Sequence, residues 1–202
     1  MTQNAPIAGE GPASQHIVQL FDSTESLVES VSVFVRDGLI HGDAVLVVMR
    51  LPQWNSIASR LSSRNVALSD AIGSGQLTVL DGIRTLARIM WHGTPIRGLF
   101  DEVVGKTVRQ IRSRGAQLRV YGDIVDALAE DGNFHAAHEL ERLWSDLVAQ
   151  EPMTLLCGYS AATFHSPETS ETFTSICRSH TDVRLNQLRV PPVAPAVLDR
   201  RP

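Results

Sequence analysis

The chain has 202 residues, a length suited to one sizeable hydrophobic core rather than two full domains. Apolar residues make up 43% of it and charged residues 20%, near the average for a soluble globular protein. A net charge of −4 gives no overall basic field that would favour nucleic acid or an anionic membrane surface.

Composition also argues against membrane insertion, secretion and a disulfide framework. No apolar run approaches the roughly 20 residues that span a bilayer, and the first residues lack the basic-then-apolar order of a signal peptide. Two cysteines, Cys157 and Cys177, are too few for a disulfide scaffold. We therefore expect a cytoplasmic protein with a flexible lead at 1–14, a folded domain at 15–184 and a Pro-rich tail at 185–202.

Apolar runs alternate with helical patterns along the expected domain. The runs predict strands at 16–21, 43–49, 77–82, 117–125 and 153–159. Helical spacing predicts a helix that starts at Ser23 or Thr24 and is stopped by Gly38 and Gly42, and further helices at 53–64, 68–74, 83–92, 96–114, 133–150 and 168–179. This alternation predicts an α/β three-layer sandwich with a mostly parallel sheet. Ligands bind such sheets beyond the carboxyl ends of the strands, here FDST, MRLP, LDG, YGDI and CGYS.

The tripeptide Gly-Lys-Thr at 105–107 matches the end of a phosphate-binding loop. A complete loop needs a glycine five residues earlier, where this chain has Phe100, and it must lie between a strand and a helix. Apolar residues at helical spacing on both sides place the tripeptide inside a helix instead. The segment FDSTESL after the first strand has no glycine or lysine, and its Asp22 and Glu25 would repel a triphosphate.

A series of short motifs follows His16 in a fixed order: FVRDGLIHGDAVLVV at 34–48, RVYGDIVDAL at 119–128, GNFHAAHELERLW at 132–144, LLCGY at 155–159 and ICRSHTDV at 176–183. In order and spacing they resemble the MEDS family, the sensory domain named after methanogens, methylotrophs and the dichloromethane-responsive repressor. That family looks like a relative of the KaiC and RecA ATPases without a functional Walker A loop. The resemblance covers roughly residues 15–184.

This resemblance implies a sensory or regulatory input module that responds to small molecules such as hydrocarbon derivatives. Two motifs depart from the family's usual pattern. The family usually shows Gly-Glu-Met where this chain has Gly122-Asp123-Ile124, and Cys-Ala-Tyr where it has Cys157-Gly158-Tyr159. Asp123 keeps the carboxylate but shortens its reach, so the resemblance leaves the ligand open.

Asp123, at the end of the fourth predicted strand, lies where α/β sheets place functional carboxylates. With Asp22 and Asp81 it could form an acidic cluster at the carboxyl edge of the sheet, and a helix cap or loop hydrogen bond is the alternative. Our hypothetical ligand-binding residues, drawn from this edge and from the family motifs, are His16, Asp22, Ser23, Thr24, Asp123, Glu141 and Tyr159.

Two sets of side chains have some character of a metal site. His135 and His138 are three residues apart on a predicted helix, with Glu139 and Glu141 nearby, but a solvated face with an inward glutamate salt bridge is favoured. Glu141 also matches a Leu-Glu pair of the family, so the resemblance implies a structural or gating role for it.

Cys157, Cys177 and His180 could supply three zinc ligands, although a buried free cysteine is the more usual state of Cys157 in a strand. His16 and His180 could meet at one edge of the sheet. We expect no metal, no cofactor and no catalytic residue.

The remaining aromatic and basic residues have simpler interpretations. Trp91 and Trp144 are interpreted as packing residues rather than as platforms for a ligand. A basic run is interpreted as a solvated helix face, with a partner or nucleic-acid patch as the alternative; it consists of Arg109, Arg112, Arg114 and Arg119.

The sequence thus predicts a non-catalytic sensory domain that binds a small molecule near Asp22, Ser23, Thr24 and Asp123 and signals to a protein partner. The alternative is a ligand-free adaptor that acts by homo- or hetero-oligomerisation. An ATPase with an atypical loop is a third hypothesis, disfavoured by the missing lysine and glycines. We expect no membrane association and no direct contact with nucleic acid.

Overall fold

The computed structural model describes residues 14–164 and 167–185, so the predicted lead and tail lie outside the described residues except at positions 14 and 185. Six parallel strands form one sheet in the order β3-β2-β6-β7-β1-β8. They are β1 (Gln15–Phe21), β2 (Ala44–Met49), β3 (Leu77–Asp81), β6 (Leu118–Gly122), β7 (Thr154–Ser160) and β8 (Asp182–Leu185). Two short strands, β4 (Met90–Trp91) and β5 (Thr94–Pro95), form a separate antiparallel hairpin.

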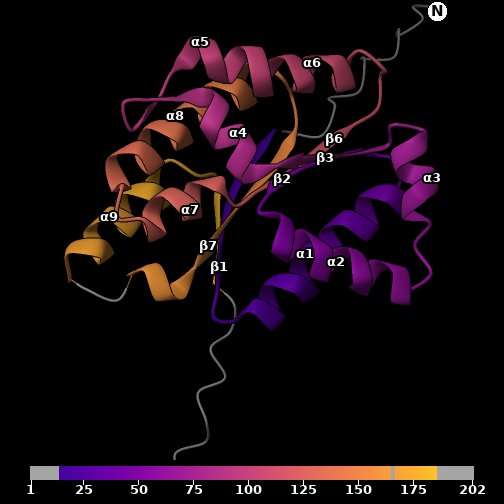
Figure 1. Cartoon of the computed structure of the whole chain (residues 1–202), viewed down its shortest axis with the longest axis horizontal. Coiled ribbons are helices and arrows are strands. Elements are labelled where there is room, and N and C mark those ends of the chain that lie inside the picture. The colour runs from indigo at the N-terminus through magenta and orange to yellow at the C-terminus, as the bar shows by residue number, and fades with distance from the viewer. Residues whose placement is uncertain (1–13, 165–166, 186–202) are drawn as a thin grey trace, which may run out of the picture.

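Helices cover both faces of the sheet (Figure 1). One face packs against α1 (Thr24–Ile40), α2 (Leu51–Ser63) and α3 (Leu68–Gly73). The other packs against α4 (Gly82–Ile89), α5 (Arg97–Phe100), the π-helical turn η1 (Asp101–Gly105), α6 (Lys106–Arg112), α7 (Ile124–Glu130), α8 (Phe134–Gln150) and α9 (Pro167–Arg178). A 3-10 turn, η2 (Ala161–Phe164), follows β7. The predicted three-layer α/β architecture with a mostly parallel sheet is confirmed.

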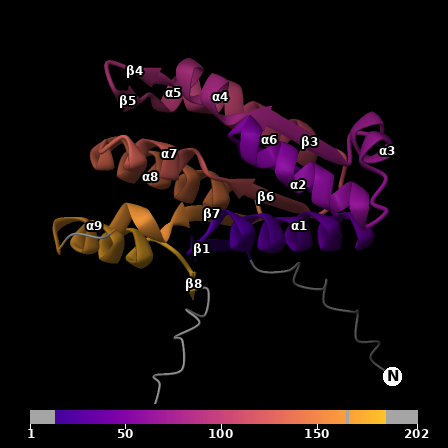
Figure 2. The same ribbon diagram turned by 60° about the horizontal axis from the view of Figure 1, so that its bottom comes forward.

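The burial of each strand follows its place in the sheet. Every residue of β2, with the sequence AVLVVM, is buried, as expected of a strand covered on both faces. The four residues of β8 are all exposed, because this strand lies at the edge beside β1 (Figure 2). Sequence analysis did not predict β8 or the β4–β5 hairpin, since both are too short to show a period.

Helix α1 shows one confirmed prediction and one correction. Ser23 caps its start, in a reciprocal pair of hydrogen bonds with Ser26. Gly38 does not stop the helix but lies inside it, where a Cβ would come within 2.8 Å of Val45 Cγ2. Glycine is therefore needed there for close packing of α1 on β2, and the chain leaves the helix only at Gly42, whose φ is +80°.

The Gly-Lys-Thr tripeptide lies inside a helix, as predicted. Gly105 ends the π-helical turn η1, and Lys106 and Thr107 begin α6 without a break in the helical backbone. The Thr107 hydroxyl donates to the carbonyl of Val103, one turn earlier, rather than standing free. Among the described residues, none of the helices combines the length and apolar character needed to cross a membrane.

Candidate functional site

The carboxyl ends of the parallel strands share one edge of the sheet, and a pocket of about 280 Å³ opens there. Asp22, Ser23 and Thr24 follow β1 and line this pocket, and Asp123 follows β6. We call the following group the carboxyl-edge site: Asp22, Ser23, Thr24, Arg50, Asp123, Asp126, Glu130 and Ser160. A larger hollow of about 800 Å³ is an open groove between α1 and α2 that shares Thr24 with this site.

Arg50, the first residue after β2, holds the carboxyl-edge site together. Its Nε lies 3.0 Å from Asp123 Oδ2, its Nη2 2.8 Å from Asp126 Oδ2 and its Nη1 2.5 Å from Glu130 Oε2. The side chains of Asp123 and Asp126 are only 1% and 3% exposed, whereas that of Glu130 is 43% exposed. One cation thus faces three carboxyl groups, which leaves an excess of negative charge beside the pocket.

Asp126 is the central acid of this network. Its Oδ1 accepts hydrogen bonds from the Ser160 amide at 2.9 Å and from the Thr163 hydroxyl at 3.2 Å. Burial raises the pKa of Asp126 to about 6, with Glu130 adding to the rise, while the Ser160 amide and Arg50 act to lower it. Asp126 therefore links α7 to the end of β7. With a pKa of about 6, its carboxyl group changes between the neutral and the charged form near that pH.

The β1–α1 turn does not have the geometry of a phosphate loop. The Ser26 amide donates to Ser23 Oγ at 3.2 Å, and the Ser23 amide donates to Ser26 Oγ at the same distance. Ser23 Oγ also lies 3.3 Å from Asp22 Oδ1. These contacts use amides that a phosphate loop would offer to its ligand, so the role of Ser23 in this structure is to cap α1.

The hypothetical acidic cluster of Asp22, Asp81 and Asp123 does not form. Asp81 ends β3, which lies four strand spacings from β1 in the sheet order, or about 19 Å. Its carboxylate instead caps α4 by accepting hydrogen bonds from the amides of Ile83 and Arg84. Asp123 has Asp126 and Glu130 as its acidic neighbours, because α7 begins directly after it.

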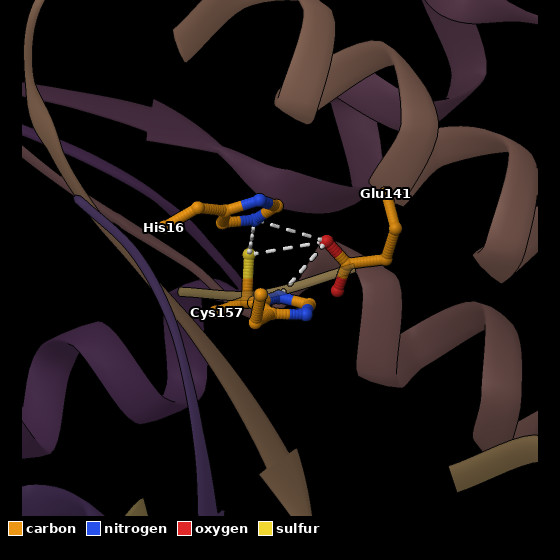
Figure 3. A group of neighbouring side chains, drawn as sticks. His16, Glu141 and Cys157 are labelled. Carbon is orange, nitrogen blue, oxygen red and sulfur yellow. Dashed lines mark hydrogen bonds and ion pairs between the residues drawn. The ribbon is translucent and has the colours of Figure 1, made fainter. Parts of the chain in front are cut away.

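A second group of polar side chains lies within the core, between the sheet and α8 and α9. We call it the buried histidine–glutamate cluster: His16 on β1, Glu141 on α8, Cys157 and Tyr159 on β7, and His180 after α9. Figure 3 shows His16, Cys157 and Glu141 turned toward one another. Glu141 Oε2 lies 3.2 Å from His16 Nε2, 3.4 Å from His180 Nε2 and 3.5 Å from Cys157 Sγ.

Glu141 is the charged centre of this cluster. Burial alone would raise its pKa, but the close approach of the His16 and His180 ring nitrogens holds the pKa well below its ordinary value. The pKa of His180 is raised, because the attraction of Glu141 outweighs burial. The Tyr159 hydroxyl donates to Glu141 Oε1 at 2.8 Å. The predicted inward ion pair of Glu141 and the meeting of His16 with His180 are both confirmed.

The seven hypothetical ligand residues thus divide between two places. Asp22, Ser23, Thr24 and Asp123 lie at the carboxyl-edge site, and His16, Glu141 and Tyr159 lie in the buried histidine–glutamate cluster. Sequence reasoning missed the other four members of the first site, Arg50, Asp126, Glu130 and Ser160. Arg50 could have been found as a charged residue directly after a fully apolar strand, and Asp126 and Glu130 as acids one turn apart on a helix that starts at Asp123.

Other interpretations from the sequence have mixed outcomes. Trp144 is fully buried and packs edge-on against Phe100, with ring centroids 5.2 Å apart, as expected of a packing residue. Trp91 is 65% exposed on the β4–β5 hairpin, so its interpretation as a packing residue was wrong. His135 and His138 lie on the exposed face of α8, as predicted.

The basic run does not form one solvated face. Arg109 pairs with Asp101 and Arg119 with Asp43. Arg112 and Arg114 donate to backbone carbonyls, those of Ala116 and Gly75. These arginines therefore stabilise separate parts of the fold.

The fold is an α/β three-layer sandwich similar to that of KaiC-like structures. A KaiC-like protein of the hyperthermophilic archaeon Pyrococcus horikoshii superimposes with a TM-score of 0.58 at 13% sequence identity, covering 86% of this chain and 73% of that one. An uncharacterized protein of Pyrococcus horikoshii, in complex with an unknown peptide, superimposes with a TM-score of 0.63 at 11% identity, covering 84% and 76%. At such identities the likeness shows the fold alone.

The sequence itself assigns the family. The profile of the methanogen/methylotroph, DcmR sensory domain, abbreviated MEDS, matches residues 15–181. This match spans most of the chain, so the protein belongs to the MEDS family. A comparison with curated proteins gives no match.

Proposed function

We propose that this chain is a non-catalytic sensory module that binds a small organic molecule at the carboxyl-edge site and passes the signal to a protein partner. Membership of a sensory-domain family supports the regulatory role. The single observation that carries the location is the bridge from Arg50 to Asp123, Asp126 and Glu130 beside a pocket at the strand ends.

The chemistry of the carboxyl-edge site favours a ligand with a cationic or hydrogen-bond-donating group. Three carboxyl groups share one guanidinium there, so a second donor would find acceptor oxygens at Asp126 and Glu130. Phe21 and Leu27 supply apolar lining for a short hydrocarbon portion. The volume of about 280 Å³ fits a small amine, amide or alcohol better than a nucleotide.

Occupation of this site would reach the rest of the molecule through α7. A ligand that competes for Asp126 and Glu130 loosens their hold on Arg50, which anchors the β2–α2 turn. Because residues 131–133 alone separate α7 from α8, displacement of α7 acts directly on the start of α8. The two arrangements that a sensor needs are then Arg50 bound to the α7 carboxylates and Arg50 released from them.

The proposal is tested by thermal unfolding of the full chain with single compounds from four classes: small primary amines, neutral alcohols and amides, carboxylates, and ATP with magnesium. At one hundred times its dissociation constant a ligand stabilises the fold by roughly 2.7 kcal/mol. For a chain of this size that raises the Tm by roughly 5–11 °C. We expect such a rise with one amine or neutral compound and none with ATP–magnesium.

Matched variants locate the effect. Glu130→Gln removes an acceptor of the carboxyl-edge site, whereas Glu139→Gln makes the same change in the ion pair of Glu139 with Arg142 on the outer face of α8. The first should abolish the ligand-induced rise in Tm and the second should leave it intact. A rise with ATP–magnesium would instead support an atypical ATPase. No rise with any compound, together with a molecular mass that increases with protein concentration, would support the ligand-free adaptor.

A further inference from the structure

The buried histidine–glutamate cluster brings together four side chains of the types that bind transition metals. His16, Glu141, Cys157 and His180 each offer one ligand atom, and these four atoms lie within 4.8 Å of one another. They come from three elements and the segment after α9, so chain proximity does not explain why they gather. Imidazole, thiolate and carboxylate are the ligands that Zn²⁺ uses in proteins.

The spacing of the four atoms matches a tetrahedron. Ligands bound to Zn²⁺ at 2.0–2.3 Å stand roughly 3.3–3.8 Å from one another along the tetrahedral edges. Four of the six edges are defined by direct contacts. His16 Nε2 lies 3.3 Å from Cys157 Sγ and 3.2 Å from Glu141 Oε2. Glu141 Oε2 lies 3.5 Å from that sulfur and 3.4 Å from His180 Nε2.

The second ring nitrogens of the two histidines are oriented as in known metal sites. His180 Nδ1 lies 2.7 Å from the carbonyl oxygen of Ile176, a contact that requires a proton on Nδ1, so Nε2 is the nitrogen directed into the cluster. His16 Nδ1 lies 3.1 Å from Ser145 Oγ, so its Nε2 also faces inward. Buried His180 Nε2 has no hydrogen bond of acceptable geometry, as an unfilled ligand position would show.

The carboxylate of Glu141 is also oriented to coordinate a metal ion. Tyr159 donates to Oε1 of Glu141, which leaves Oε2 as the atom nearest to His16, Cys157 and His180. A divalent ion bound to one carboxylate, one thiolate and two neutral imidazoles has no net charge. That neutrality suits a site in which Glu141 is 0% exposed.

We propose that His16, Glu141, Cys157 and His180 form a closed tetrahedral site for one divalent transition metal ion of the Zn²⁺ class. On binding, the Cys157 thiol loses its proton to solvent and its sulfur coordinates as the thiolate. Four protein ligands fill the tetrahedron, so the site has the character of a structural or regulatory centre rather than of an open catalytic one. The ion ties β1, α8, β7 and the segment after α9 to one point.

Cobalt is the probe for this proposal, because Co²⁺ replaces Zn²⁺ in tetrahedral sites and absorbs visible light. The full chain is stripped with a chelator and titrated with Co²⁺ and then with Zn²⁺. We expect one equivalent of Co²⁺ to give the intense visible bands of tetrahedral cobalt and a thiolate-to-cobalt charge-transfer band in the near ultraviolet. One equivalent of Zn²⁺ should abolish both. The readout needs no organic ligand, so it is independent of the function proposed for the carboxyl-edge site.

Matched variants assign the ligands. Cys157→Ser should lose the charge-transfer band, and Cys177→Ser, which changes the other cysteine of the chain, should keep it. His180→Gln should lose the tetrahedral bands, whereas His138→Gln on the exposed face of α8 should keep them. Tyr159→Phe keeps all four ligands and removes only the outer hydrogen bond to Glu141, so it should weaken Co²⁺ binding by about 10-fold.

Two results would overturn the proposal. One is a stripped wild-type chain that develops no tetrahedral cobalt bands. The other is a spectrum that survives in Cys157→Ser but is lost in Cys177→Ser or His138→Gln. If Cys157→Ser does not fold, the charge-transfer band of the wild type and the weakening in Tyr159→Phe still decide the question.

Discussion

The rings of His16 and His180 lie in contact, with centroids 3.9 Å apart, although one residue is the second of the first strand and the other follows the last described helix. The backbone makes the same connection, since the Thr181 amide donates to the carbonyl of His16 at 2.7 Å. Strand β8 then pairs with β1 from Ile17 onward. Both imidazoles approach Glu141, so one buried carboxylate joins the start of the sheet to its last strand.

Glu141→Gln should therefore destabilise the metal-free protein. The amide cannot replace the charge that attracts His16 and His180, and its NH2 group faces the Tyr159 hydroxyl or the histidine nitrogens. Breaking a buried pair of this kind costs about 3–5 kcal/mol of unfolding free energy. Urea unfolding in the presence of a chelator measures the loss. The same change at partly exposed Glu139 should stay within about 0.5 kcal/mol, and equal losses at both positions would contradict the central role of Glu141.

Asp126 should make stability fall as the pH rises from 4 to 6. Burial raises the pKa of Asp126 to about 6 in the folded protein, above the ordinary value of 3.8 that applies to the unfolded chain. Between these values the folded state holds a proton that the unfolded state has lost, so the folded state is favoured at the low end of the window. Its advantage decreases by about 1.4 kcal/mol per pKa unit, on the order of 3 kcal/mol in total.

Unfolding free energies of the wild type and of Asp126→Asn, measured from pH 4 to pH 7, isolate this contribution. Because Glu141 and other acids titrate in both proteins, the informative quantity is the wild-type value minus the variant value. That difference should fall through the window and level off above pH 6–7. A difference that stays constant or rises would mean that Asp126 is already ionised at pH 4 in the folded state.

Arg50→Met should be strongly destabilising at neutral pH. It leaves Asp123 and Asp126 buried without their cation, and breaking such a network costs about 3–5 kcal/mol. Adding Asp126→Asn to this variant should recover part of the loss, because one of the unpaired charges is removed. Arg60→Met is the matched control: Arg60 bridges Glu25 and Glu29 at the surface, and its loss should change the urea midpoint little. No recovery in the double variant would show that the carboxyl groups were already neutral.

The sequence was sufficient to predict the architecture because long apolar runs determine it. The run at 43–49 became a strand buried on both faces, and the helical pattern around Gly105 placed Gly-Lys-Thr in a helix. Short elements have no long apolar run, so they were not predicted. Strand β8 has four exposed residues, and its pairing with β1 depends on contacts distant in sequence.

Side-chain partners could be predicted less well than elements. Asp81 and Asp123 both end strands, yet the sheet order that separates Asp81 from β1 is not visible in local patterns. Arg50 was not predicted as a site residue because a single arginine after a strand usually faces solvent. Its contacts with Asp126 and Glu130 of α7 arise only in the folded chain. The sequence grouped His180 with Cys157 and Cys177, whereas the structure keeps Cys157 in the group and has His16 and Glu141 in place of Cys177.

Gly158 provides a test of packing inside β7. A Cβ at this position would come within 2.4 Å of the Tyr121 hydroxyl and 3.0 Å of Phe21 Cε2, and Tyr121 is fully buried. Gly158→Ala should therefore lower the unfolding free energy by about 1–3 kcal/mol, the usual cost of overpacking a core. Gly122, at the end of the neighbouring strand β6, is the control, because a Cβ there has the carbonyl oxygen of Val48 as its nearest neighbour at 3.9 Å.

Chemical denaturation of Gly158→Ala and Gly122→Ala makes the comparison directly. The double variant Gly158→Ala with Tyr121→Phe removes the hydroxyl that the new methyl group would meet, and it should recover part of the lost stability. Since the Tyr121 hydroxyl is buried without a hydrogen-bond partner among the described residues, its removal carries little cost of its own. If the double variant is no more stable than Gly158→Ala, the strain lies in the contact with Phe21. Glycine would then be needed at position 158 to make room for the Phe21 ring rather than for Tyr121.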